Sequence, residues 1–187
     1  MKELSLNVLD IAKNSVKAGA SLIEISLEEE NHLLTLTITD NGCGMTPEVL
    51  QGVVNPFYTT RTTRKVGLGI PLLKLAAEQT GGTVGITSRH IDLSPQDHGT
   101  QVVATFYTNH IDFTPIGDLI STLQTLIMGS PEIDFVFLHR TEQLSVALDT
   151  REMREILGAD VSLGDFEIIQ WIGQYLREQY DGPAIEE

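Results

Sequence analysis

The stretch DNGCGM at residues 40–45 constrains the fold of this 187-residue chain more than any other segment. It ends the run LLTLTITD, in which apolar residues alternate with threonines, as in a strand that buries one face. The carboxylate of Asp40 is therefore delivered at the end of a strand. Gly42 and Gly44 follow it, and they allow the backbone to turn sharply and a flat ligand to approach without a Cβ in the way. The stretch predicts one wall of a pocket for a planar ring.

Apolar spacing predicts the element order α-β-β-α-α-β-β over residues 1–108. Ser5 is the expected N-cap of the first helix and Gly19 its stop, while Thr46 caps a short helix that has Pro47 at its first position. This order predicts an α+β fold, a two-layer α/β sandwich with one helical layer on a mixed or antiparallel sheet. The predicted segments are helices at 6–17, 47–54 and 70–80 and strands at 21–30, 33–40, 83–88 and 100–108.

A smaller α-β-β-α-α pattern follows in residues 109–187. A helix is predicted over residues 114–128, a hairpin turns around Thr141 and Glu142, and Thr150 is the expected N-cap of the next helix. We therefore expect a domain boundary after residue 108, followed by a small α+β unit of unknown role. The last helix is predicted to have an apolar face made of Phe166, Ile169, Ile172, Tyr175 and Leu176.

The net charge of −14 is concentrated in the C-terminal part. Residues 1–109 carry 8 Lys/Arg and 11 Asp/Glu, whereas residues 110–187 carry 4 and 15. An acidic surface repels phosphate backbones, so nucleic acid is not an expected partner. No apolar run is long enough for a membrane span or a signal peptide, and the single cysteine, Cys43, fits a reducing compartment, so we expect a cytoplasmic protein. The acidic unit is expected to pack on the first domain or to form a partner or homodimer surface.

Asp10, Asn14 and Lys17 are spaced by four and three residues, which places an acid, an amide and an amine on one face of the first predicted helix. Alone, this stripe is also typical of a solvated helix face. The basic segment that includes Arg61 precedes Gly67 and a helix, which predicts a loop over a site and backbone N–H groups directed at an anion. A GLG sequence before a helix is weak support by itself.

Taken together, these features resemble the nucleotide-binding domain shared by gyrase, the ninety-kilodalton heat-shock chaperones, sensor histidine kinases and MutL, known as the GHKL superfamily. The resemblance covers about residues 5–108 and depends on the NSxxAGA, DNGCGM, GLGI and GT segments in this order. Within the predicted loop, the segment PFYTTR resembles the histidine kinases, and so does Lys17. The segments AGA and DNGCGM resemble MutL instead. The resemblance implies a histidine-kinase-like ATPase fold with the nucleotide between the helices and the sheet.

The resemblance also implies a role for each matching residue. Asp40 would accept a hydrogen bond from the adenine amine, and Asn14 would give its amide oxygen to Mg²⁺. Asp10 would be the catalytic base that activates the nucleophile. The implied cofactors are ATP and Mg²⁺, with ADP as the other bound form. The implied nucleotide-binding set is Asn14, Lys17, Asp40, Gly42, Gly44, Met45, Thr59, Thr60, Arg61, Gly67, Leu68, Gly69, Ile70 and Thr100.

Asp10 stands where hydrolysing relatives usually have glutamate. Aspartate is one methylene shorter, and a displacement of about 1 Å can cost on the order of 10²-fold in rate, so we expect slow hydrolysis or phosphoryl transfer. Only nine residues precede Asp10, and none of the five histidines resembles a phosphoacceptor on a helical hairpin. The resemblance thus implies a stand-alone kinase or ATPase that acts on a partner protein. The alternative is a non-catalytic, nucleotide-dependent regulatory module.

Overall fold

The computed structural model describes residues 3–54 and 69–182. Most of the predicted segments form close to the predicted positions, including the four strands of the first half and the hairpin around Thr141 and Glu142. The helices are α1 (Leu4–Lys17), α2 (Pro47–Val54), α3 (Gly69–Gln79), α4 (Leu119–Gly129), α5 (Thr150–Leu157) and α6 (Phe166–Asp181). The strands are β1 (Leu22–Glu30), β2 (Leu33–Asp40), β3 (Val84–Arg89), β4 (Gly99–Tyr107), β5 (Asp134–Arg140) and β6 (Ser145–Asp149).

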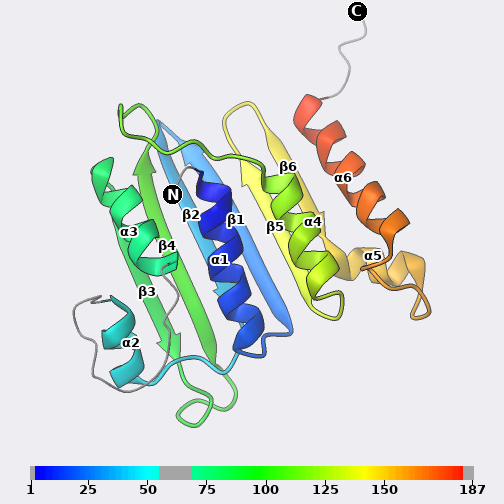
Figure 1. Cartoon of the computed structure of the whole chain (residues 1–187), viewed down its shortest axis with the longest axis horizontal. Coiled ribbons are helices and arrows are strands. Elements are labelled where there is room, and N and C mark those ends of the chain that lie inside the picture. The colour runs from blue at the N-terminus through cyan, green and yellow to red at the C-terminus, as the bar shows by residue number, and fades with distance from the viewer. Residues whose placement is uncertain (1–2, 55–68, 183–187) are drawn as a thin grey trace, which may run out of the picture.

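The strands form one sheet with the order β3-β4-β2-β1-β5-β6. β1 and β5 are parallel, and the other neighbouring strands are antiparallel. Figure 1 shows α1, α3 and α4 against one face of this sheet. The predicted α+β fold, a two-layer α/β sandwich on a mixed sheet, is confirmed.

The core lies between the helices and the sheet. Along β2, Leu34, Leu36 and Ile38 are buried, whereas the intervening threonines are half-buried on the opposite face. β4 repeats this alternation, with Phe106 fully buried near the end of the strand. Removing these apolar side chains from water stabilises the sandwich by roughly 25 cal/mol per Å² of buried apolar area. The covered face of the sheet therefore positions α1 above β2.

The strands of the C-terminal unit continue the sheet of the first half. β5 pairs with β1 from Leu22↔Asp134 to Glu28↔Arg140, and α4 lies beside α1 (Figure 1). The two predicted units therefore share one sheet, and a boundary between folding units after residue 108 stays a prediction. Among the described residues, no helix has both the length and the apolar character needed to cross a bilayer.

Two predicted helix starts are wrong, that of α1 because distant backbone carbonyls accept from its first N–H groups, and that of α4 because a nearby aspartate side chain is the cap. α1 begins at Leu4 rather than after Ser5, since the N–H groups of Leu4 and Ser5 donate to the carbonyls of Pro115 and Ile116 at 2.9 and 2.8 Å. α4 begins at Leu119 rather than at residue 114, because Asp118 accepts a 2.9 Å hydrogen bond from the Ser121 N–H.

Two details of the last helices also differ from the prediction. Asp149, not Thr150, caps α5, because its carboxylate accepts from the Arg151 N–H while the Thr150 hydroxyl accepts from the Phe135 N–H. The predicted apolar face of α6 is only partly correct. Ile169, Ile172 and Leu176 are buried, but Phe166 and Tyr175 are exposed.

Candidate functional site

Asp40 is held at the end of β2 by two hydrogen bonds. Its Oδ2 accepts from the hydroxyl of buried Ser15 at 2.6 Å, and its Oδ1 accepts from the N–H of Gly42 at 2.9 Å. Ser15 comes from α1, so the bond joins the helical layer to the strand end. Each carboxylate oxygen has two lone pairs, so Asp40 keeps capacity to accept a further hydrogen bond from a ligand.

The two glycines Gly44 and Gly99 occur where no other residue fits. Gly44 has φ +68°, and a Cβ there would overlap the carbonyl oxygen of Arg89. Gly99 has φ +135°, and a Cβ there would overlap the backbone of Asp40. The predicted sharp turn agrees with the positive φ of Gly44, and the close packing of Gly44 on the end of β3 and of Gly99 on the end of β2 is a further reason for glycine that was not predicted.

The turn after Asp40 is also fixed by three polar residues that the sequence pattern did not indicate: Asn41, Ser88 and His98. Asn41 Oδ1 accepts from the N–H groups of Ser21 and Leu22, both at 2.9 Å. The Ser88 hydroxyl accepts from the Met45 N–H and lies 2.8 Å from the Thr100 hydroxyl. His98 Nδ1 lies 2.6 Å from the Gly42 carbonyl oxygen, so that nitrogen carries the proton. These partners are distant in sequence, and only a folded sheet brings them together.

A cavity of about 250 Å³ opens beside Asp40. Its walls are mostly apolar and come from α1, β2, α2, α3, β3 and β4, so the helical layer and the sheet enclose it together. Its size lies slightly below the roughly 300–1,000 Å³ of drug-sized pockets, which suits one ring system with the rest of the ligand outside. The lining residues are Ile11, Asn14, Ser15, Ala18, Ile38, Asp40, Gly44, Met45, Val53, Ile70, Ile86, Thr100 and Val102.

Most of the described residues in the predicted set meet at this cavity. Its lining includes six of them, and Gly42 bonds directly to Asp40. Ser15 was not predicted, although a polar residue on the apolar face of α1, one turn after Ile11, is a signal that could have identified it. The six are Asn14, Asp40, Gly44, Met45, Ile70 and Thr100.

Asp10 and Lys17 lie outside the cavity lining, on the exposed part of α1. The start of α3 approaches α1 at this point, because a Cβ added to Gly69 would be 3.2 Å from the Cβ of Asp10. The carboxylate of Asp10 therefore lies near the start of α3, on the side of the cavity where the exposed amide of Asn14 is found. Five predicted residues, together with the predicted loop over the site, lie outside the described residues: Thr59, Thr60, Arg61, Gly67 and Leu68.

The donors near the cavity suit a magnesium ion held mainly by phosphate and water. Within residues 3–54 and 69–182, no group of three or more His, Cys, Asp or Glu side chains could hold a metal by itself. Asn14 offers an exposed amide oxygen, and Asp10 precedes it by one helical turn. Mg²⁺ usually takes one or two protein oxygens together with substrate phosphates and keeps several waters, so this sparse donor set fits it.

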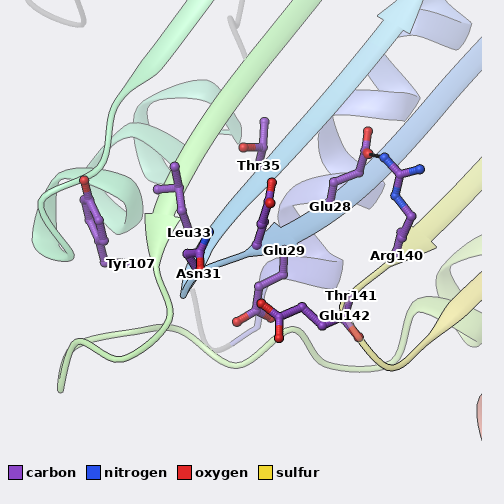
Figure 2. Close-up of a pocket in the computed structure, with 10 residues that line it drawn as sticks. Glu28, Glu29, Asn31, Leu33, Thr35, Tyr107, Arg140, Thr141 and Glu142 are labelled. Carbon is purple, nitrogen blue, oxygen red and sulfur yellow. Dashed lines mark hydrogen bonds and ion pairs between the residues drawn. The ribbon is translucent and has the colours of Figure 1, made fainter.

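A larger hollow of about 850 Å³ lies on the face of the sheet opposite the helices (Figure 2). Glu28, Glu29, Glu30 and Glu142 contribute to its walls, and Arg140 pairs with Glu28 on the neighbouring strand. This excess of carboxylates repels phosphate groups, and the hollow has no glycine-rich turn. The smaller cavity is therefore the better candidate for an anionic ligand.

The sheet order and the cavity beside Asp40 define this chain as an α+β sandwich of the GHKL type. A family model described as histidine kinase-, DNA gyrase B-, and HSP90-like ATPase matches residues 2–110. The chain belongs to this family.

Curated relatives include sporulation kinase B of Bacillus subtilis, 34% identical over 89 residues that make up 46% of this chain and 21% of the relative. The sensor protein SrrB of Staphylococcus aureus is 33% identical over 93 residues, 47% of this chain and 16% of the relative. The chain therefore spans about a fifth or less of the length of these two relatives.

Solved structures extend the likeness in fold. The Aquifex aeolicus MutL ATPase domain complexed with ADP matches with a TM-score of 0.52 and 14% identity, over 84% of this chain and 69% of that chain. The N-terminal domain of a DNA repair protein matches with a TM-score of 0.54 and 16% identity, over 80% of this chain and 52% of that one. These two structures cover 80% and 84% of this chain, which is more than the family model covers with residues 2–110. The shared fold therefore extends beyond residue 110.

Proposed function

We propose that this chain binds Mg-ATP, with the adenine ring in the cavity beside Asp40. The proposal depends mainly on the Asp40 carboxylate. Ser15 and the Gly42 N–H hold it in one orientation and leave lone pairs for the exocyclic amine of adenine. Guanine presents a carbonyl oxygen at that position, which would face the carboxylate unfavourably. Met45 and the apolar lining provide contact area for the ring, and Thr100 lies beside Ser88 at the same end of the cavity.

The phosphates would extend from the cavity toward the start of α3. The N–H groups of Gly69 and Ile70 at the start of this helix would donate to phosphate oxygens, as helix N-termini commonly do. By family resemblance, Gly67 and Leu68 would contribute N–H groups as well. A bound magnesium ion would neutralise phosphate charge, and the amide oxygen of Asn14 would contribute to holding it. By family resemblance, Lys17 and the loop residues Thr59, Thr60 and Arg61 would add donors to the same phosphates.

We infer that Asp10 is the base in a slow hydrolysis or a transfer of the γ-phosphoryl group to a partner protein. The carboxylate would take the proton from the attacking water or acceptor group while a new P–O bond forms. The bond between the γ-phosphorus and the bridging oxygen breaks, and ADP leaves with that electron pair. Asp10 borders the α3 start, where the phosphates are expected, and this position supports the assignment.

The second candidate is a regulatory module that binds the nucleotide without using it. This candidate is favoured by the residue at position 10, since aspartate is one methylene shorter than the glutamate that hydrolysing relatives usually have. In this case nucleotide binding would change which partner the protein binds. Both candidates include a cytoplasmic location. This part of the proposal is supported by Cys43, a free, exposed thiol that fits a reducing compartment.

Isothermal titration calorimetry with ATP and Mg²⁺ tests the binding proposal. Asp40→Asn should weaken ATP binding by about 10-fold or more, because a hydrogen bond to a charged group contributes roughly 1.5–3 kcal/mol. Asp160→Asn is the matched control, since it removes the same charge from an exposed residue of the C-terminal unit. Equal affinity of Asp40→Asn and the wild type would overturn the proposal.

Release of labelled phosphate from ATP separates the two candidates. Slow release that Asp10→Asn abolishes, with ATP affinity unchanged, supports the enzyme. ATP binding with neither release of labelled phosphate nor transfer of the label to candidate partner proteins supports the regulatory module. Release that continues at the wild-type rate in Asp10→Asn removes Asp10 as the base.

A further inference from the structure

Helix α6 presents two aromatic side chains to solvent. Trp171 is 52% exposed and Tyr175 is 38% exposed. Their rings are stacked, with centroids 5.0 Å apart and an interplanar angle of 11°. The opposite side of the helix is buried through Ile172 and Leu176, so α6 packs onto the protein mainly through other residues than this pair. The pair therefore forms a rigid apolar surface without a partner in the described part of the chain.

Acidic side chains flank the aromatic pair on the same side of α6. Glu167 and Glu178 are four residues before and seven residues after Trp171, which places all three on one helical face. We call Glu167, Trp171, Tyr175 and Glu178 the α6 stripe. The carboxylate of Glu178 accepts a 2.9 Å hydrogen bond from Gln174 and stays exposed.

No cation of α6 neutralises the α6 stripe. Arg177 is the one basic residue of the helix, and its position six residues after Trp171 places it on a different face of α6. The Ser121 hydrogen bonds, and to a smaller extent the charge of Arg177, lower the pKa of the Asp118 carboxyl at the N-cap of α4. The C-terminal part of the chain is also acidic, since residues 110–187 carry 15 Asp/Glu and 4 Lys/Arg. The stripe is thus an aromatic pair flanked by two carboxylates in an acidic part of the chain.

We propose that the α6 stripe docks a basic segment of a partner protein. Lysine or arginine side chains of that segment would lie against the faces of Trp171 and Tyr175 and pair with Glu167 and Glu178, while its apolar residues cover the rings. A second copy of this chain is a poorer occupant, since each copy has a net charge of −14 and would bring the same carboxylates into contact. Anionic membranes and nucleic acids are disfavoured for the same reason.

The α6 stripe lies at the opposite end of the sheet from α2 and α3, which border the candidate nucleotide cavity (Figure 1). Docking on α6 therefore does not require a bound nucleotide. The inference is independent of the proposed function, and each can fail without the other.

The test uses an 18-residue fluorescein-labelled peptide with lysine and leucine at helical spacing, and a peptide in which glutamate replaces each lysine. Fluorescence anisotropy with the full chain should show saturable binding of the basic peptide only. Trp171→Ala should weaken this binding by about 10-fold or more, as expected for a central aromatic contact. Glu167→Gln with Glu178→Gln should weaken it and reduce its salt dependence. All changed side chains are exposed, and circular dichroism verifies the fold.

The matched control is Glu30→Gln with Glu78→Gln, which removes the same charge from exposed residues outside the C-terminal unit. This variant should bind the basic peptide like the wild type. The proposal is overturned if the basic peptide does not bind, if the acidic peptide binds equally well, or if the control weakens binding as much as the stripe variant. It is also overturned if sedimentation shows a wild-type dimer that Trp171→Ala dissociates, because the occupant is then a second copy.

Discussion

The hydroxyl of Ser15 donates a 2.6 Å hydrogen bond to the carboxylate of Asp40, and this contact joins α1 to the end of β2. Both residues line the candidate nucleotide cavity. A carboxylate that reads an adenine amine must keep one orientation, and Ser15 provides the side-chain contact that fixes Oδ2. In the proposed ATP site, Ser15 would therefore act on the ligand through Asp40, as a positioning residue.

Ser15→Ala should weaken ATP binding by about 10-fold, because it removes a hydrogen bond to a charged group worth roughly 1.5–3 kcal/mol and leaves the carboxylate free to rotate. Calorimetric titration with ATP and Mg²⁺ measures the change. Ser145→Ala, an exposed serine on β6, is the control and should leave the affinity unchanged. An unaltered dissociation constant in Ser15→Ala would contradict this role.

Gly44→Ala should destabilise the fold by about 2 kcal/mol or more. The backbone has φ +68°, which disfavours a side chain, and the added Cβ would overlap the Arg89 carbonyl oxygen. Urea denaturation followed by circular dichroism measures the loss. Gly85→Ala on the neighbouring strand β3 is the control, since a Cβ there meets no atom within 4 Å, and its effect should be within about 0.5 kcal/mol. Equal stability of the two variants would show that the turn after Asp40 can move away from β3.

Local patterns in the sequence were sufficient for most elements and for the presence of a turn after Asp40. The alternation of β2 with its threonines predicted which face is buried, and the glycines predicted a sharp turn, but not that Gly44 packs against the backbone of Arg89. These signals lie within one segment of chain. Strand pairing between β1 and β5 was not predicted, because a sequence pattern does not state which strands become neighbours.

The missed contacts around the turn after Asp40 join residues that are far apart in the sequence, whereas the two missed helix caps, Asp118 and Asp149, accept from N–H groups three and two residues further on. Ser88 reaches the Met45 N–H, and His98 reaches the Gly42 carbonyl, across gaps of 43 and 56 residues. The start of α1 was misplaced for the same reason, since Pro115 and Ile116 satisfy its first N–H groups. Serine and histidine side chains can form such bonds with many backbone groups, and only the tertiary structure determines which groups are their partners.

Buried His139 should make the free energy of unfolding depend on pH between about 7 and 5. Its Nδ1 lies 2.9 Å from the Tyr180 hydroxyl, while its Nε2 is buried without a hydrogen-bond partner among the described residues. Burial lowers the pKa of His139 below the unfolded value of 6.5, although the charge of Glu29 opposes this shift. The unfolded chain therefore binds the proton more readily, and stability falls as the pH drops below about 6.5.

Urea titrations at a series of pH values measure this dependence. His139→Gln should flatten the slope between pH 7 and 5, even if it lowers stability at pH 7. His32→Asn is the control, because His32 is exposed in the turn between β1 and β2 and should leave the slope unchanged. A slope that persists in His139→Gln would assign the pH dependence to other groups.

Gln179 of α6 occupies the free edge of β6. Its side chain accepts from the Ala147 N–H at 2.9 Å and donates to the Ala147 carbonyl at 3.0 Å, as a neighbouring strand would. An edge strand with open backbone groups favours pairing with another chain, and Gln179 prevents this pairing at Ala147.

Gln179→Ala should therefore lower the free energy of unfolding by about 1–2 kcal/mol, from two lost hydrogen bonds, and should promote association at high protein concentration. Denaturation and sedimentation velocity measure both effects. Gln170→Ala, an exposed position on the same helix, should change neither, and a monomeric Gln179→Ala of wild-type stability would show that the β6 edge needs no cover.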